Sequence, residues 1–206
     1  MIWNERPTLA GEHVRLEPLE LHHTEGLFEA GRDPDVWTWL SVFQPADVAA
    51  TRDMITSILA DPARQAFAQI DACTGAVAGT TSYYQLDARN RILCIGHTWI
   101  GTPWQRTALN TEAKLLLLTH AFDVRDANRV AWETDINNTR SQRAIERLGA
   151  VREGILRGHR IRKEGSIRDT VLYSVTKPEW PVVRDRLAAR LAETTARPAT
   201  PATRLV

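Results

Sequence analysis

The sequence is poor in cysteine, with only Cys73 and Cys94 among its 206 residues. The two lie far apart in the chain and match no spacing typical of a zinc site or a redox pair. This argues against a cysteine-based metal site and against a disulfide framework. We therefore expect no metal, and two reduced, buried thiols in a cytoplasmic protein.

The sequence also lacks a strong net charge and a long apolar run. Its 26 basic and 25 acidic residues leave a net charge of +1, which gives no reason to expect a nucleic acid or a membrane surface as partner. No stretch approaches the ~18 apolar residues of a membrane-spanning helix. The N-terminus lacks the apolar segment after a basic start that marks a signal peptide.

What is present suits one folded domain. An apolar content of 43% in 206 residues is sufficient for a hydrophobic core. We predict a single domain over residues 1–193. Residues 194–206 are rich in Thr, Pro and Ala, so we predict a flexible, solvated tail there.

Hydrophobic periodicity and turn residues predict a mixed succession of strands and helices. This succession predicts an α/β (α+β) fold, with a mixed central β-sheet flanked by helices on both faces. The predicted strands cover residues 14–16, 65–71, 76–84, 92–100, 129–134, 152–161 and 167–175. The predicted helices cover residues 21–30, 46–60, 111–124, 141–148 and 180–192, with a further turn of helix over 35–40.

One strand runs directly into a long apolar helix, in the stretch GHTWIGTPWQRTALNTEAKLLLL. Unpaired backbone amides collect at such a helix start and form a cradle for anions. The turn, residues 105–110, contains no glycine, which excludes a Walker loop and a dinucleotide-binding fingerprint. On spacing alone, an ordinary strand-to-helix loop would look the same.

The element order, this strand–turn–helix, and the segment Asn138–Ser141 followed by Arg147–Ala150 resemble the GNAT acyltransferases. More narrowly, they resemble the RimJ/RimL type, which acetylates the N-termini of ribosomal proteins. The resemblance covers roughly residues 8–185. It implies the GNAT fold, with acetyl-CoA as co-substrate.

The resemblance implies that the amides of the turn hold the pyrophosphate of acetyl-CoA. Gln105 matches the first position of the family's turn, whereas Ala108 and Asn110 stand in place of its two glycines. An added methyl is tolerable if it points away from the ligand, and Asn is tolerated at positive φ. An amide of the strand that ends at Ile100 would hold the carbonyl oxygen. The predicted acetyl-CoA contacts are Ile100, Gln105, Arg106, Thr107, Ala108, Leu109, Asn110, Thr111, Asn138 and Ser141.

The same resemblance implies direct attack of an amine on the thioester, without a covalent enzyme intermediate. The tyrosine that many members use as general acid falls at Ile145 and is absent. Ser141 is the predicted general acid, although it could simply cap its helix. Asn138 is predicted to contact the pantetheine arm or polarise a water, but it could also be a loop residue in a left-handed turn.

For the general base, His97 is the first candidate, because an ordinary pKa of about 6.5 suits proton removal near neutral pH. Simple alternation places Ile95, His97 and Trp99 on one face of their strand. His97 could instead be a hydrogen-bonded core residue. Glu133 and Asp135 are alternative bases or members of a water chain, and could equally lie on a solvated strand edge.

The sequence gives weaker evidence for the residues that bind the acceptor amine. Trp37, Trp39 and Phe43 fall where GNAT proteins usually form the acceptor pocket, although core packing would also explain them. One of Tyr83 and Tyr84 should face the acceptor, and we expect Tyr83 and His97 to contact it. The basic hairpin could be a solvated face, or could steer an acidic acceptor or the 3′-phosphate of CoA. Its basic residues are Arg152, Arg157, His159, Arg160, Arg162, Lys163 and Arg168.

The sequence thus predicts an N-acetyltransferase that moves an acetyl group from acetyl-CoA to a primary amine. The acceptor is either a protein N-terminus or a small amine, since the fold does not determine it. The alternative is a non-catalytic module that binds acyl-CoA, a peptide or RNA. A homodimer is implied by the branch alone.

Overall fold

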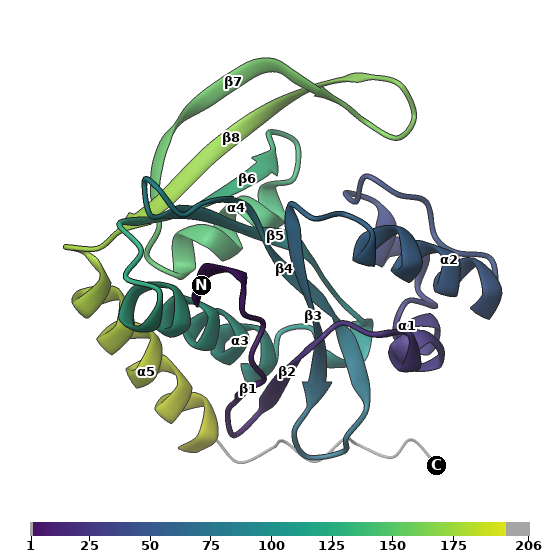
Figure 1. Ribbon diagram of the computed structural model, residues 1–206, viewed down its shortest axis with the longest axis horizontal. Helices are drawn as coiled ribbons and strands as arrows, with labels where there is room; N and C mark the ends of the chain where they lie inside the picture. Colours follow the sequence, from purple (N-terminus) through teal and green to yellow (C-terminus); the bar gives the residue numbers. More distant parts are fainter. Residues whose placement is uncertain (1, 197–206) are drawn as a thin grey trace, which may run out of the picture.

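The computed structural model describes residues 2–196, in which eight strands form one sheet (Figure 1). Their order across the sheet is β1-β2-β3-β4-β5-β6-β8-β7. Neighbouring strands are antiparallel except β5 and β6, which are parallel. The strands are β1 Leu9–Ala10, β2 Val14–Pro18, β3 Arg64–Asp71, β4 Val77–Asp87, β5 Ile92–Ile100, β6 Arg129–Asp135, β7 Val151–Ile161 and β8 Ile167–Thr176.

Helices cover both faces of the sheet, which confirms the predicted architecture (Figure 1). The face packed against α3, α4 and α5 shares one apolar core with them, and is called the α3 face below. The opposite face packs α1 and α2 over a second apolar core, and is called the α1 face. The α-helices are α1 Thr24–Ala30, α2 Val48–Leu59, α3 Ala108–Thr119, α4 Thr139–Arg147 and α5 Trp180–Ala196. Short 3-10 segments are η1 Ile2–Asn4, η2 Leu21–His23, η3 Pro34–Trp37 and η4 Thr102–Trp104, and a π turn, η5 His120–Val124, follows α3.

The parallel strands β5 and β6 are joined along only part of their length. They pair from Ile92 with Arg129 to Cys94 with Ala131, and then diverge. Beyond this point, the backbone groups on the edge of β5 that faces β6 pair with no strand of residues 2–196. The gap therefore opens toward the ends of both strands, where α3 and α4 begin.

A bulge changes the direction of the side chains in the second half of β5. His97 has a φ of +49°, and the register against β4 shifts there. Ile95 consequently lies in the core of the α3 face, whereas Trp99 lies in the core of the α1 face. The expectation that Ile95, His97 and Trp99 share one face was wrong, because simple alternation does not continue through a bulge.

Element boundaries differ from the predicted ones mainly at helix ends. α3 begins at Ala108 rather than at residue 111, because Thr107 is its N-cap. α5 extends to Ala196, so the first residues of the predicted flexible tail are helical. Residues 197–206 of that tail lie outside the described residues. The short strand β1 was not predicted.

The environments of the two cysteines differ from each other. Cys94 is buried as expected, but Cys73 is exposed because it lies in the turn between β3 and β4. Burial raises the pKa of the Cys94 thiol to about 11. Among the described residues, no helix has the length and apolar character needed to span a membrane.

Candidate active site

Two helix N-termini meet at the open end of the gap between β5 and β6. α3 follows β5 through η4, and α4 follows β6 after a short turn. The Arg140 Nη2 atom in α4 donates to the Gln105 Oε1 atom before α3 at 2.6 Å, which joins the two starts directly. Both helices present the positive ends of their dipoles here, so the place suits an anion.

The α3 start shows why this turn needs no glycine. Only Arg106 in the turn takes a positive φ, at +63°, and its side chain is exposed. Ala108 is the first helical residue and is only 8% exposed, so its methyl group is packed into the protein. Neither Ala108 nor Asn110 occupies the left-handed region that would require glycine.

The amides at the α3 start are available to a ligand. The first amides of a helix have no acceptor within it. Here the Thr107 hydroxyl accepts from the Leu109 amide at 3.3 Å, and we find no protein acceptor for the Ala108 and Asn110 amides within residues 2–196. The buried Asn110 Oδ1 atom also has no partner among these residues.

The other predicted contacts of this turn differ in how they could act. Gln105 donates from Nε2 to the Ile100 carbonyl at 2.9 Å, so its side chain ties the turn to the end of β5. Leu109 is 3% exposed and belongs to the core, so it can contribute only backbone. Thr111 is partly exposed on the first turn of the helix.

The start of α4 separates the roles of Asn138 and Ser141. Asn138 is the N-cap, and its Oδ1 atom accepts from the Ser141 amide at 3.0 Å. Its φ of −83° is not left-handed. Ser141 is therefore not the cap, and its hydroxyl has no hydrogen-bond partner within the part of the chain described. That leaves the hydroxyl able to donate to a ligand.

His97 lies on the α1 face with its ring edge-on to Tyr84, at 5.0 Å between centroids. Desolvation by the surrounding protein and the charges of Arg64 and Arg160 lower the pKa of His97 to about 4. The residue itself is exposed, so solvent screens these charges, and the imidazole is neutral at pH 7 in either case. It can accept a proton, but an inflection at pH 6–7 is not expected from it.

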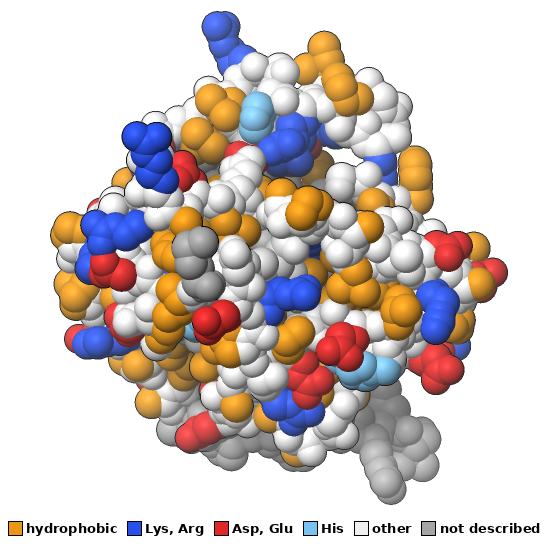
Figure 2. All heavy atoms as spheres, viewed as in Figure 1, with side chains coloured by type: hydrophobic (Ala, Val, Ile, Leu, Met, Phe, Trp, Pro, Cys, Tyr) orange, Lys and Arg blue, Asp and Glu red, His pale blue; other side chains and the backbone are white. Residues whose placement is uncertain are grey.

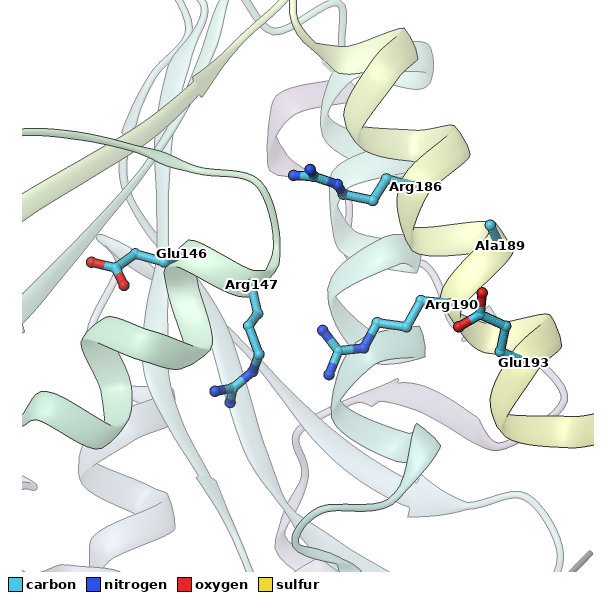
Figure 3. A pocket seen from close by; sticks show the side chains of 6 residues that line it. All are labelled: Glu146, Arg147, Arg186, Ala189, Arg190 and Glu193. Atoms are coloured by element: carbon cyan, nitrogen blue, oxygen red, sulfur yellow. The ribbon is translucent and has the colours of Figure 1, made fainter. Parts of the chain in front are cut away.

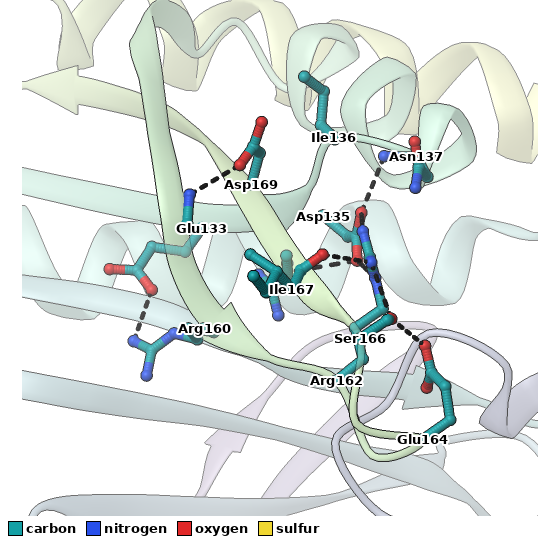
Figure 4. A network of polar contacts seen from close by, with 12 residues as sticks. Glu133, Asp135, Ile136, Asn137, Arg160, Arg162, Glu164, Ser166, Ile167 and Asp169 are labelled. Carbon is teal, nitrogen blue, oxygen red and sulfur yellow. Dashed lines mark hydrogen bonds and ion pairs between the residues drawn. The ribbon is translucent and has the colours of Figure 1, made fainter.

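Glu133 and Asp135 are both held by arginines of the β7–β8 hairpin (Figure 4). Glu133 accepts from Arg160 at 2.8 Å. Asp135 accepts from Arg162 at 2.6 and 3.0 Å, and these guanidinium hydrogen bonds keep its pKa low against the opposing effect of burial. Neither carboxylate lies on a solvated edge, since their side chains are 10% and 5% exposed.

The predicted acceptor aromatics have different environments. Trp37 is buried against Trp99 and donates to the Gly31 carbonyl, so it is mainly a core residue. Trp39 is 42% exposed and Phe43 66%. Both belong to the segment between α1 and α2 and are available to a ligand.

Tyr83 does not fit the role of a substrate contact. It has no exposed surface, and its hydroxyl donates to the Leu117 carbonyl beneath α3. Tyr84 points to the other face and lies beside His97. A Cβ at Gly96 would come within 2.7 Å of the Tyr84 ring, so this glycine makes room for it.

Sequence reasoning missed Lys114, which is buried on α3. Its Nζ atom donates to the Thr81 and Thr98 hydroxyls at 2.9 and 2.8 Å and has no carboxylate partner among the described residues. Burial lowers its pKa to about 7. The available signal was a single lysine within the apolar run of residues 113–118.

A surface groove and a group of side chains that could bind a metal both lie away from the two helix starts. A groove of about 520 Å³ runs between α4 and α5, where Figure 3 shows Arg186 and Arg190 pointing from α5 toward α4. Within residues 2–196, Glu17, His22 and His23 place possible ligand atoms within 4.8 Å of one another. His23 is already engaged by Glu17 and by the backbone of Glu20, which accounts for its position without an ion.

Comparison with known proteins agrees with this geometry. Residues 13–151 match the acetyltransferase (GNAT) domain family. The uncharacterized N-acetyltransferase p20 of Bacillus licheniformis is 28% identical over 177 residues, which cover 84% of this chain and 98% of p20. YdaF of Bacillus subtilis (strain 168), provisionally named a ribosomal N-acetyltransferase, is 35% identical over 52% of this chain and 57% of YdaF.

A solved structure extends the similarity over nearly the whole fold. A GCN5-related N-acetyltransferase from Brucella melitensis is 35% identical, with a TM-score of 0.91, over 95% of this chain and 90% of that chain. The residues that match the GNAT domain family, 13–151, include β5, β6 and the starts of α3 and α4. The chain belongs to the GNAT acetyltransferase family, whose members use acetyl-CoA.

Proposed function

We propose that this enzyme transfers the acetyl group of acetyl-CoA to a primary amine by direct attack. The observation that carries the proposal is the meeting of two helix N-termini at the gap between β5 and β6, joined by the hydrogen bond between Arg140 and Gln105. Acetyl-CoA supplies a reactive thioester and an anionic pyrophosphate.

The residues at this place fit such a ligand. The amides of Ala108 and Asn110 would hold the pyrophosphate, together with the dipoles of both helices. Arg106 adds an exposed cation at the same turn. The unpaired edge of β5 beyond Cys94 offers backbone donors for a carbonyl oxygen, where they stabilise developing negative charge.

Proton transfer is assigned to the Ser141 hydroxyl and to a water beside His97. The Ser141 hydroxyl, which its helix leaves without a partner, returns a proton to the leaving sulfur. A pKa of about 4 makes the His97 imidazole a weak base, so we assign removal of the amine proton to a water that His97 positions. His97 is exposed, so this water can pass the proton to bulk solvent. Glu133 then positions Arg160 instead of acting as the base.

Calorimetric titration with acetyl-CoA, CoA and NAD tests the donor site. Micromolar binding of acetyl-CoA without binding of NAD is the expected result. A screen of amines follows, with release of the CoA thiol as the readout. Binding without turnover of any amine would favour the alternative, a non-catalytic acyl-CoA module.

The similarity to YdaF supports the RimJ/RimL-like branch, in which a protein N-terminus is one acceptor class. A cytoplasmic location stays a prediction from the sequence, and a homodimer stays a prediction from the resemblance to the branch. Size-exclusion chromatography with light scattering would test the dimer directly.

A further inference from the structure

A half-buried guanidinium without a hydrogen-bond partner lies on the α1 face beside the candidate site. Arg168 belongs to β8, and its side chain is 18% exposed. Its buried Nε atom has no partner, and its other donors make no hydrogen bond within residues 2–196. A guanidinium removed from water without acceptors is costly, so this side chain is suited to receive an anion.

The neighbouring carboxylates are already engaged. Asp135 Oδ2 is 3.9 Å from the Arg168 Nε atom, but both oxygens of Asp135 accept from Arg162 at shorter distances. Glu133 is paired with Arg160 (Figure 4). The nearest carboxylate to Arg168 is therefore that of Asp135, which is already hydrogen-bonded to Arg162.

Further cations surround the same space. Arg64 donates to the Ser82 hydroxyl at 2.9 Å and Lys163 to the Trp37 carbonyl at 2.5 Å, and neither forms an ion pair among the described residues. The positive charges of Arg64 and Arg160 lower the pKa of His97 by more than the negative charges of Asp61 and Glu133 raise it. The space in front of His97 therefore carries a surplus of positive charge.

We propose that the acceptor is a small amine that also carries a carboxylate or a phosphate group, and that Arg168 binds this anion. The proposal rests on the proposed function and names its acceptor class. A guanidinium suits both anions because its donors match their paired oxygens. The surplus positive charge also disfavours the ammonium form of the bound amine, which helps to produce the neutral amine that attacks.

The hairpin tip favours a small acceptor over a folded protein. Lys163 reaches across to the segment between α1 and α2, where it also lies over the Phe43 ring at 5.3 Å. Figure 2 shows Lys and Arg side chains gathered where the surface is hollowed below the β7–β8 hairpin. The contact between tip and segment covers this hollow on one side.

Four amines that share a 2-aminoethyl group test the proposal. They are β-alanine, O-phosphoethanolamine, ethanolamine and 1,2-diaminoethane, each assayed with acetyl-CoA by release of the CoA thiol. We expect kcat/KM for at least one anionic amine to exceed that for ethanolamine by about tenfold. Whichever of β-alanine and O-phosphoethanolamine reacts faster identifies the anion.

Substitutions of Arg168 test whether this residue causes the preference for an anionic amine. Arg168→Gln should abolish the preference for the anionic amine, and Arg168→Lys should retain part of it. Arg52→Gln, which removes an exposed arginine on α2, is the matched control and should retain the full preference. Thermal unfolding verifies that each variant is folded.

A second readout does not depend on turnover. Calorimetry should show tighter binding of N-acetyl-β-alanine than of N-acetylethanolamine to the wild type, and equal binding to Arg168→Gln. Equal kcat/KM across the amines with equal binding of the two products would overturn the proposal, as would a preference that persists in Arg168→Gln. Failure of acetyl-CoA itself to bind would instead reject the proposed function.

Discussion

The two faces of the sheet contribute different chemical groups to the same site. On the α3 face, the site consists of backbone amides at two helix starts and one serine hydroxyl. On the α1 face, it consists of charged side chains, with Glu133 and Asp135 held by arginines of the hairpin. Backbone donors exist in any sequence that forms the helix, whereas each charged group requires its own residue.

This difference explains how the donor site tolerates a turn without glycine. The cradle depends on the positions of amides, and Arg106, which alone in residues 105–110 is left-handed, lies before the helix. The acceptor side is expected to vary more among relatives, because its charge depends on individual residues such as Arg168. Substitutions on one face should therefore leave the contribution of the other face unchanged.

The largest effect is expected from Ser141→Ala on the α3 face. Loss of the general acid should lower kcat about 100-fold, with little change in the affinity for acetyl-CoA. Ser141→Thr keeps a hydroxyl and should retain more activity. Steady-state kinetics and calorimetry measure the two quantities, and an unchanged kcat in Ser141→Ala would remove the residue from the mechanism.

Removing a single amide should weaken acetyl-CoA binding about tenfold, because hydrogen bonds to charged groups contribute roughly 1.5–3 kcal/mol. Ala108→Pro does this at the first helical position, where proline fits and where the preceding Thr107 is extended. Val48→Pro makes the same change at the start of α2 and is the control. Equal affinities for acetyl-CoA in the two variants would show that the amide is not part of the cradle.

Lys114→Met should change how stability depends on pH. Burial lowers the pKa of Lys114 from 10.5 to about 7, so between these values the unfolded chain binds more protons than the folded one. Stability should therefore rise with pH between about 7 and 9, by up to about 1.4 kcal/mol per pH unit from this group. Urea unfolding of both proteins would measure the difference in slope, and identical slopes would contradict a neutral, buried lysine.

The smallest effect is expected from His97→Asn on the pH profile. The folded-state pKa of about 4 leaves this imidazole neutral from pH 6 to 8, so any inflection in that range should survive the substitution. The rate itself should fall if His97 positions the water that removes the proton of the attacking amine. Disappearance of an inflection near pH 6.5 would instead restore His97 as a titrating base.

Local sequence pattern was sufficient for most of the fold. The apolar periodicity located nearly every strand and helix, because each element buries one face wherever it packs. Helix starts were less well predicted, since Thr107 and Asn138 cap their helices by side-chain geometry that composition alone does not distinguish. The turn, Asn138 and Ser141 were recognised through resemblance and not through spacing.

The sequence by itself determined the family, the mixed sheet between two layers of helices, and the presence of amides at two helix starts. Only the tertiary structure decided which side chains meet there. The structure shows a bulge at His97, burial of Tyr83 and Lys114, and no hydrogen-bond partner for Arg168 within residues 2–196. These features depend on strand register and on contacts between distant segments. Periodicity is a local property, whereas the charge and access of a site depend on what the rest of the chain places against it.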